Sequence, residues 1–167
     1  MEDYEEEYGY DLFEYLEYGD PNENRNIPEW PYWRITALEL PDGLSSIGSY
    51  AFFCFAKVTN VTIPASVTRM GKGAFRKCIA MQSVNIPDGV TSLSEELFMS
   101  CGSLASVTIP NSVTSIENDA FVDCVKLTDI TIPDGVTDIG DRAFGGCQSL
   151  TELTIPSSVT GIGEKSF

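Results

Sequence analysis

The sequence predicts a repeat solenoid, with a parallel β-sheet on one face and short helical or 3₁₀ turns on the opposite face. Two observations support this fold class. Prolines and phenylalanines each recur every 23 residues without a break, and the apolar positions between them keep the same phase. A fixed period of about 20–50 residues is the signature of stacked repeats. The periodic residues are Pro41, Pro64, Pro87, Pro110, Pro133 and Pro156, and Phe52, Phe75, Phe98, Phe121, Phe144 and Phe167.

The period divides the chain into a leader, residues 1–34, and six repeats, residues 35–167, of which the last is incomplete. A single repeat cannot fold alone. Fixing its backbone costs ~1–2 kcal/mol per residue, whereas its roughly eight apolar side chains return only ~1.5–3 kcal/mol each when buried. Neighbouring repeats must therefore share one core.

The leader is acidic and tyrosine-rich, and it ends in an aromatic N-terminal cap. Before a break at Gly19 and Pro21, apolar side chains recur every four residues, which is the spacing of one helical face; they are Tyr4, Tyr8, Leu12 and Leu16. Trp30 and Trp33 follow the break. We interpret the second part as a degenerate half-repeat that covers the first repeat, while the first part fits either a cap helix or a disordered tail.

The fourth repeat shows the elements expected in every unit. Residues 104–109 alternate apolar and polar after Leu104, as a half-buried strand does. Pro110 ends the strand, because proline lacks the N–H donor of a ladder. Turn-forming pairs such as Asp-Gly follow the prolines. The segment Ala120-Phe121-x-x-Cys124 has the three-residue spacing of one helical or 3₁₀ turn.

One position before that turn is glycine in four repeats, at Gly48, Gly71, Gly140 and Gly163. Ser94 and Glu117 occupy the same position in the other two repeats. Because these residues disfavour a left-handed backbone, the sequence does not require a positive φ there.

The charge is strongly negative and unevenly distributed. Of the net −15, the leader contributes −9 and the longer repeat region −6. Nucleic acid is excluded as a partner, because binding phosphates requires a basic face. No apolar run approaches the roughly 18 residues of a membrane span. The N-terminus lacks the basic start and apolar segment of a signal peptide.

The sequence predicts no enzyme, no cofactor and no metal site. Without any histidine there is no Ser-His or Cys-His pair, and no phosphate-binding glycine loop is present. No Cys-x-x-Cys pair exists either. We expect buried core thiols instead, because free cysteine behaves as a small hydrophobic residue. The cysteines are Cys54, Cys78, Cys101, Cys124 and Cys147.

The strands expose polar side chains on the face away from the core, and this face is the first candidate binding surface. Threonine and serine there also suit a sheet for propensity and solubility alone, so a purely structural interpretation stays open. In the first repeat the face carries Ala37 and Glu39. The candidate residues are Asn60, Thr62, Ser83, Asn85, Ser106, Thr108, Asp129, Thr131, Glu152 and Thr154.

The second repeat is the one basic region of the chain, and it contains no acidic residue. Its basic residues are Arg69, Lys72, Arg76 and Lys77. We hypothesise an intramolecular clamp, in which carboxylates of the leader fold back onto this basic patch; the alternative is a solvated basic face.

Tyrosines in the leader lie among acidic residues, a context in which sulfation or phosphorylation would add charge for a basic partner. A cap helix or an unmodified acidic tail explains the same residues. The candidates are Tyr4, Tyr8, Tyr10, Tyr15 and Tyr18.

The repeat pattern Leu-x-x-Val-x-Ile-Pro-x-x-Val-x-x-Ile-Gly-x-x-Ala-Phe-x-x-Cys resembles the BspA-like, or Treponema-type, leucine-rich repeat. The resemblance covers residues 35–167. It implies a curved solenoid and a non-enzymatic protein-interaction module, adhesin-like or host-interacting, at the cell surface. The alternative is a structural spacer or assembly segment of a longer surface protein without a dedicated ligand. Because the chain shows no signal peptide or anchor, a cytoplasmic location stays open.

The last periodic residue, Phe167, lies in the middle of the sixth repeat. The repeat therefore shows no cap for its apolar end. We expect either a fragment of a longer array or end-to-end self-association through this repeat.

Overall fold

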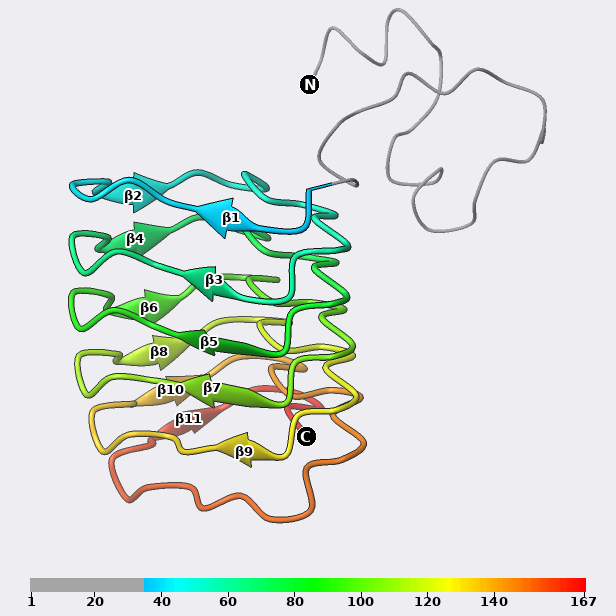
Figure 1. The fold of residues 1–167 in the computed structure, drawn as a ribbon. Helices are drawn as coiled ribbons and strands as arrows, with labels where there is room; N and C mark the ends of the chain where they lie inside the picture. Colours follow the sequence, from blue (N-terminus) through cyan, green and yellow to red (C-terminus); the bar gives the residue numbers. More distant parts are fainter. Residues whose placement is uncertain (1–34) are drawn as a thin grey trace, which may run out of the picture. The chain divides into compact units, whose positions relative to one another are not determined.

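The computed structural model describes residues 35–167, which form a parallel β-solenoid in which each repeat makes one turn (Figure 1). Strands that precede the periodic prolines stack into one column, which we call the pre-proline column. Strands that follow the prolines stack into a second one, the post-proline column. The pre-proline column contains β1 (Leu38–Glu39), β3 (Val61–Thr62), β5 (Ser83–Asn85), β7 (Ser106–Thr108) and β9 (Asp129–Ile130). The post-proline column contains β2 (Ser46–Ile47), β4 (Arg69–Met70), β6 (Ser92–Leu93), β8 (Ser115–Ile116), β10 (Asp138–Ile139) and β11 (Gly161–Ile162).

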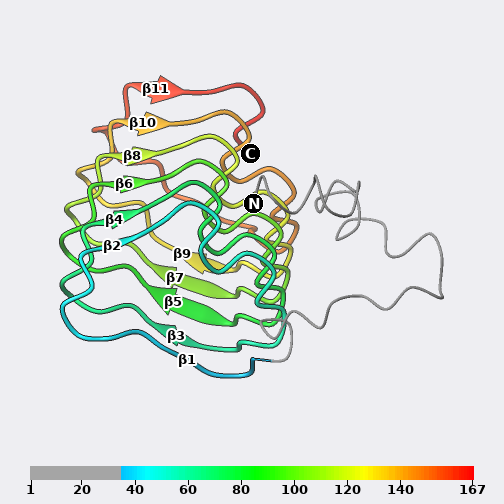
Figure 2. The ribbon, with the colours of Figure 1, turned by 90° about the horizontal axis from the view of Figure 1, so that it is seen from above.

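Every strand pair is parallel, and its Cα partners are 23 residues apart, as in Val84 opposite Val107 and Ile116 opposite Ile139. The sequence period is thus the structural register. Figure 2 shows the two columns on different sides of a common interior. The sequence predicted the pre-proline strands but not the second column, because an apolar pair such as Val113 and Ile116 is too short to indicate a strand.

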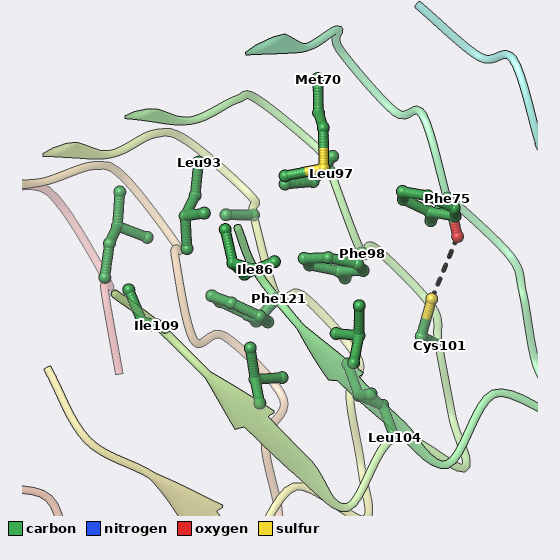
Figure 3. Packing of buried hydrophobic residues seen from close by; sticks show 14 of the residues in the cluster. Met70, Phe75, Ile86, Leu93, Leu97, Phe98, Cys101, Leu104, Ile109 and Phe121 are labelled. Atoms are coloured by element: carbon green, nitrogen blue, oxygen red, sulfur yellow. Dashed lines mark hydrogen bonds between the residues drawn. The ribbon is translucent and has the colours of Figure 1, made fainter. Parts of the chain in front are cut away.

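The periodic phenylalanines form a continuous stack through the interior (Figure 3). Successive rings lie 5.3–5.7 Å apart between centroids, and their planes are within 22° of parallel. Phe75, Phe98 and Phe121 are fully buried. Offset stacking of this kind adds about 0.5–1.5 kcal/mol per pair to the burial of the rings. One side chain per repeat therefore links all six turns.

The Ala-Phe-x-x-Cys segments form successive tight turns, and residues 35–167 contain no helix. The structure therefore corrects the prediction of helical or 3₁₀ turns in these segments. In the fourth repeat the N–H groups of Asp119 and Phe121 donate to the carbonyls of Asp141 and Ala143 in the next repeat, at 2.9 and 2.8 Å. Only alternate N–H groups bond locally, such as that of Cys124 to Phe121. A helix would need every one of these donors for itself.

Two positions of this turn side adopt a left-handed backbone in repeat after repeat, with φ between 51° and 74°. Most of these residues are not glycine, so each costs roughly 1–2 kcal/mol of backbone strain. The first position holds Tyr50, Gly73, Glu96, Asp119, Arg142 and Lys165, and the second holds Cys54, Lys77, Ser100, Asp123 and Gly146.

The glycines noted in the sequence have a different role, since none of those four has a positive φ. A Cβ on Gly71, Gly140 or Gly163 would lie only 2.4–2.6 Å from a backbone nitrogen of the preceding repeat. Close approach of neighbouring turns, and not backbone conformation, is the reason for glycine at these three positions, whereas a Cβ on Gly48 would meet nothing within 4 Å.

The last repeat departs from the stack on its pre-proline side. Residues 151–155 form no strand, so the expected strand at Glu152 and Thr154 is wrong, and β9 is the last strand of its column. A cavity of about 320 Å³ lies here, lined by apolar side chains that include Phe144, Leu150 and Leu153. Residues 35–167 offer no helix that could cross a membrane.

Candidate functional site

The pre-proline column presents the polar face that the sequence predicted. Val61, Val84, Val107 and Ile130 point inward and are buried, so the residues on either side of each point outward. Ser106 is half-buried, and the other candidates are exposed, namely Asn60, Thr62, Ser83, Asn85, Thr108, Asp129, Thr131, Glu152 and Thr154. Glu152 and Thr154 are exposed without belonging to a strand.

Threonine hydroxyls are used differently according to their position relative to the strands. Threonines directly before post-proline strands donate to the carbonyl of the residue 23 positions earlier, at 3.1–3.4 Å; these are Thr68, Thr114, Thr137 and Thr160. Thr128, directly before β9 of the pre-proline column, donates in the same way to Ala105 at 3.4 Å. On the pre-proline face, the hydroxyls of Thr62, Thr108 and Thr131 bond to no other side chain or backbone group of residues 35–167. These hydroxyls are left available for an external partner.

A groove of about 490 Å³ lies along the post-proline column and was not predicted. Carboxylates of Glu95, Glu117 and Asp138 line it, and no lysine or arginine does. Glu117 is held in place, since its carboxylate accepts from the N–H of Glu95 at 3.1 Å and the hydroxyl of Ser92 at 2.5 Å. Gly140, Gly161 and Gly163 also line the groove, and the 23-residue spacing of Gly140 and Gly163 was its only sequence signal.

Two of the four residues of the basic patch are paired with the next repeat. Lys72 lies 3.0 Å from Glu95 and 3.1 Å from Glu96, and Arg76 lies 2.6 Å from the second oxygen of Glu96. Hydrogen bonds to Glu95 and Glu96 raise the pKa of Lys72. Arg69 is exposed on β4 and Lys77 is half-buried. The leader carboxylates of the hypothesised clamp lie outside the described residues, as do the candidate tyrosines Tyr4, Tyr8, Tyr10, Tyr15 and Tyr18.

A further ion pair joins Arg142 to Asp119 at 2.9 Å. Asp119 is buried, and its Oδ1 atom has no hydrogen-bond partner among residues 35–167. The pair connects the fourth and fifth repeats on the turn side of the solenoid.

Four cysteines form a ladder in which each thiol donates to the carbonyl of a phenylalanine 26 residues earlier, at 3.1–3.2 Å; they are Cys78, Cys101, Cys124 and Cys147. Burial raises the pKa of Cys78 to about 12 and that of Cys147 to about 11, and raises the pKa of Cys101 well above its usual range. Cys78, Cys101 and Cys124 are buried as expected, whereas Cys54 and Cys147 are only half-buried because they lie near the ends of the stack.

Within residues 35–167 no three side chains of the metal-binding types come together. All five cysteines are free thiols. Two surfaces of the described residues are candidates for recognition, the polar pre-proline face and the acidic groove.

In sequence, residues 31–139 and 114–167 match the BspA type leucine rich repeat region, in six copies. The chain belongs to this family. The resemblance inferred from the 23-residue pattern is confirmed. A comparison with curated proteins found no match.

Several solved leucine-rich repeat proteins share the fold. A leucine rich cell surface protein from Faecalibacterium prausnitzii A2-165 is 37% identical, with a TM-score of 0.69 over 74% of this chain and 33% of its own. A leucine-rich repeat protein from Eubacterium ventriosum is 25% identical, with a TM-score of 0.64 over 77% of this chain and 41% of its own. The T. pallidum leucine rich repeat protein is 26% identical, with a TM-score of 0.57 over 79% and 53%. The chain thus spans about a third to a half of these proteins.

Proposed function

We propose that this chain is a non-enzymatic protein-interaction module that binds a protein partner through the pre-proline face. One observation carries the proposal: this face exposes rows of polar side chains, and its threonine hydroxyls have no partner within the solenoid. By contrast, the hydroxyls of threonines that directly precede strands, such as Thr114 and Thr137, are already bonded to the preceding turn. A partner that supplies hydrogen-bonding groups in register with the rows would satisfy them without displacing any internal contact.

The finer role that we propose is adhesin-like or host-interacting, at the cell surface. Its support is family membership and the description of the F. prausnitzii relative as a cell surface protein. Because the net charge of the chain is −15, a partner with a basic surface would associate faster at low salt than at high salt.

The test measures binding of the full chain to a panel of purified host cell-surface and extracellular-matrix proteins. A triple variant, Thr62→Glu, Thr108→Glu and Thr131→Glu, places three charges on the pre-proline face; Glu39 shows that this row accepts glutamate. We expect it to weaken saturable binding by about tenfold or more, because buried unpaired carboxylates oppose association.

The matched control carries the same three charges elsewhere, as Ala65→Glu, Asn111→Glu and Ser157→Glu. Each of these residues is exposed directly after a proline, where the other repeats already hold Asp42, Asp88 and Asp134. Binding should survive in this control. Equal binding by both triples would contradict the pre-proline face, and a chain that binds no member of the panel would favour the structural spacer.

We also propose, separately, that the sixth repeat supports end-to-end self-association. Ile162 and Phe167 are 55% and 58% exposed, whereas equivalent residues of the inner repeats are buried. Light scattering should show a mass that rises with concentration, and Ile162→Ser should reduce the rise. A strictly monomeric chain at all concentrations would exclude this contact.

A further inference from the structure

Strand pairing is reduced in both columns at the same level of the solenoid. Between the second and third repeats, β3 and β5 share a single bridge, Asn60 to Ser83, and β4 does not pair with β6 at all. From the first repeat to the fifth, every other junction has paired strands on both columns. In Figure 1 this junction lies between the strand pair β3 and β4 and the pair β5 and β6.

Ser94 provides a local cause on the post-proline side. At the equivalent position in other repeats, the backbone N–H donates across the junction, as from Gly71 to Ile47 at 2.9 Å and from Glu117 to Leu93 at 2.8 Å. At Ser94 the side-chain hydroxyl, instead of the backbone N–H, donates to the carbonyl of Met70 at 2.6 Å. The side chain therefore replaces a ladder bond.

The turn side remains closed at this junction. There, N–H groups of the second repeat donate to carbonyls of the third, as from Phe75 to Leu97 at 3.0 Å, and the rings of Phe75 and Phe98 are stacked. Of the four side-chain ion pairs within residues 35–167, three cross this junction, all made by Lys72 and Arg76. The post-proline side thus lacks strand pairing, and the pre-proline side keeps one bridge and the bond from the Gln82 N–H to the Thr59 carbonyl at 2.9 Å. The turn side is strengthened by charge.

We propose that this junction is a hinge on which residues 35–80 open, as one unit, away from residues 81–167, with the turn side as the pivot. The hinge divides the pre-proline face between Thr62 and Asn85, so opening changes the angle between two parts of that face. Glu96 holds the pivot, because its two carboxylate oxygens bind Lys72 and Arg76. The inference does not depend on what the face binds.

The test is hydrogen-exchange mass spectrometry on the full chain, which compares peptides from residues 35–80 with peptides from residues 81–149. We expect faster exchange in the first group, with a step near residue 80. Glu96→Gln should accelerate exchange in the first group by roughly tenfold and leave the second group unchanged, because local opening depends on the contacts that hold that unit. Raising salt to about 1 M should act in the same direction without any substitution.

Ser94→Gly should have the opposite effect. Without the hydroxyl, the N–H of residue 94 can donate to the carbonyl of Met70, just as the N–H groups of Gly71 and Gly140 donate to the equivalent carbonyls of Ile47 and Ile116. Exchange in residues 35–80 should therefore slow several-fold. Asp119→Asn is the matched control, since it removes the ion pair at a junction whose strands are paired on both columns. Exchange in residues 35–80 should not change in that variant.

Three outcomes would overturn the hinge. Exchange that rises gradually from the third repeat to the first would indicate ordinary fraying of an end. Equal acceleration of both groups by Glu96→Gln would indicate a single cooperative unit. Exchange in residues 35–80 that changes neither in Ser94→Gly nor at high salt would show that the Ser94 hydrogen bond and the ion pairs of Glu96 do not control opening.

Discussion

The two strand columns have the same period and the same parallel register, yet threonines on the outer pre-proline face and threonines directly before the strands use their hydroxyls differently. Thr114 and Thr137 on the post-proline side bond to the preceding turn, whereas Thr108 and Thr131 on the pre-proline side expose their hydroxyls. The comparison teaches that residue type alone does not identify a binding face in a repeat protein. What distinguishes the two sets of threonines is their position: directly before a strand the hydroxyl reaches a carbonyl of the preceding turn, as in Thr114 and Thr128, whereas Thr108 and Thr131 point away from it.

The largest expected effect comes from the interior that both columns share. Phe98→Ala should lower the free energy of unfolding by about 3–5 kcal/mol, because a fully buried ring leaves a cavity between two others. Urea denaturation measures it. Phe167→Ala, at the exposed end of the same stack, should cost well under half as much; equal losses would mean that the stack does not support the columns.

The turn side, which joins the two columns, gives the next effect. Gly146→Ala should cost about 1–2 kcal/mol, because alanine disfavours the left-handed φ of 74° at that position. Ser100→Gly, at the equivalent position with φ of 60°, should instead be neutral or stabilising by up to about 1 kcal/mol. The midpoint of thermal unfolding reports both, and a loss in both variants would contradict the account of strain.

The shared interior also predicts a pH dependence. Burial raises the pKa of the Cys101 thiol, so above a pH near 9 the unfolded chain loses a proton that the folded chain keeps, and stability falls as pH rises. Between pH 8 and pH 10 this residue should account for about 1 kcal/mol of the loss. Denaturation of Cys101→Ala at both pH values isolates that term. An identical pH dependence in the variant would show that the thiol does not contribute.

The smallest effect tests the two columns directly. Thr114→Val should lower the free energy of unfolding by about 0.5–1 kcal/mol, because it removes a hydroxyl that bonds to the carbonyl of Thr91 at 3.1 Å. Thr108→Val should be neutral, since its hydroxyl has no internal partner. Urea denaturation measures the loss of unfolding free energy in both variants. Equal losses would show that the bonded and the exposed hydroxyls do not differ in their contribution to stability.

The fold class and the core follow from the period, because residues 23 apart must stack if neighbouring repeats share an interior. Phe98, Leu104 and Val107 were therefore predictable as buried residues. The post-proline column was not, because its strands are two residues long and lack a detectable alternation. The three-residue spacing of the Ala-Phe-x-x-Cys segments predicts a helical or 3₁₀ turn. This prediction fails because the spacing does not reveal that alternate N–H groups bond to the next repeat.

The candidate site was predicted only in part. The strand alternation around Val84 and Val107 placed Asn85 and Thr108 on the outer face, and the structure leaves both exposed. The partners of Lys72 and Arg76 could not be predicted, because Glu95 and Glu96 come within reach only through stacking. The left-handed positions were equally hidden, since ordinary residues such as Ser100 and Lys77 occupy them.

The hydrogen bonds that run from each repeat to the next have a mechanical consequence. They lie along the axis of the stack, so tension applied to the two ends of the repeat region acts across the junctions in series. A repeat that detaches releases 23 residues, or roughly 75 Å of extended chain, while the remaining turns keep their contacts. Stretched between two surfaces, such a protein would lengthen in discrete steps and would absorb work before the whole domain unravels.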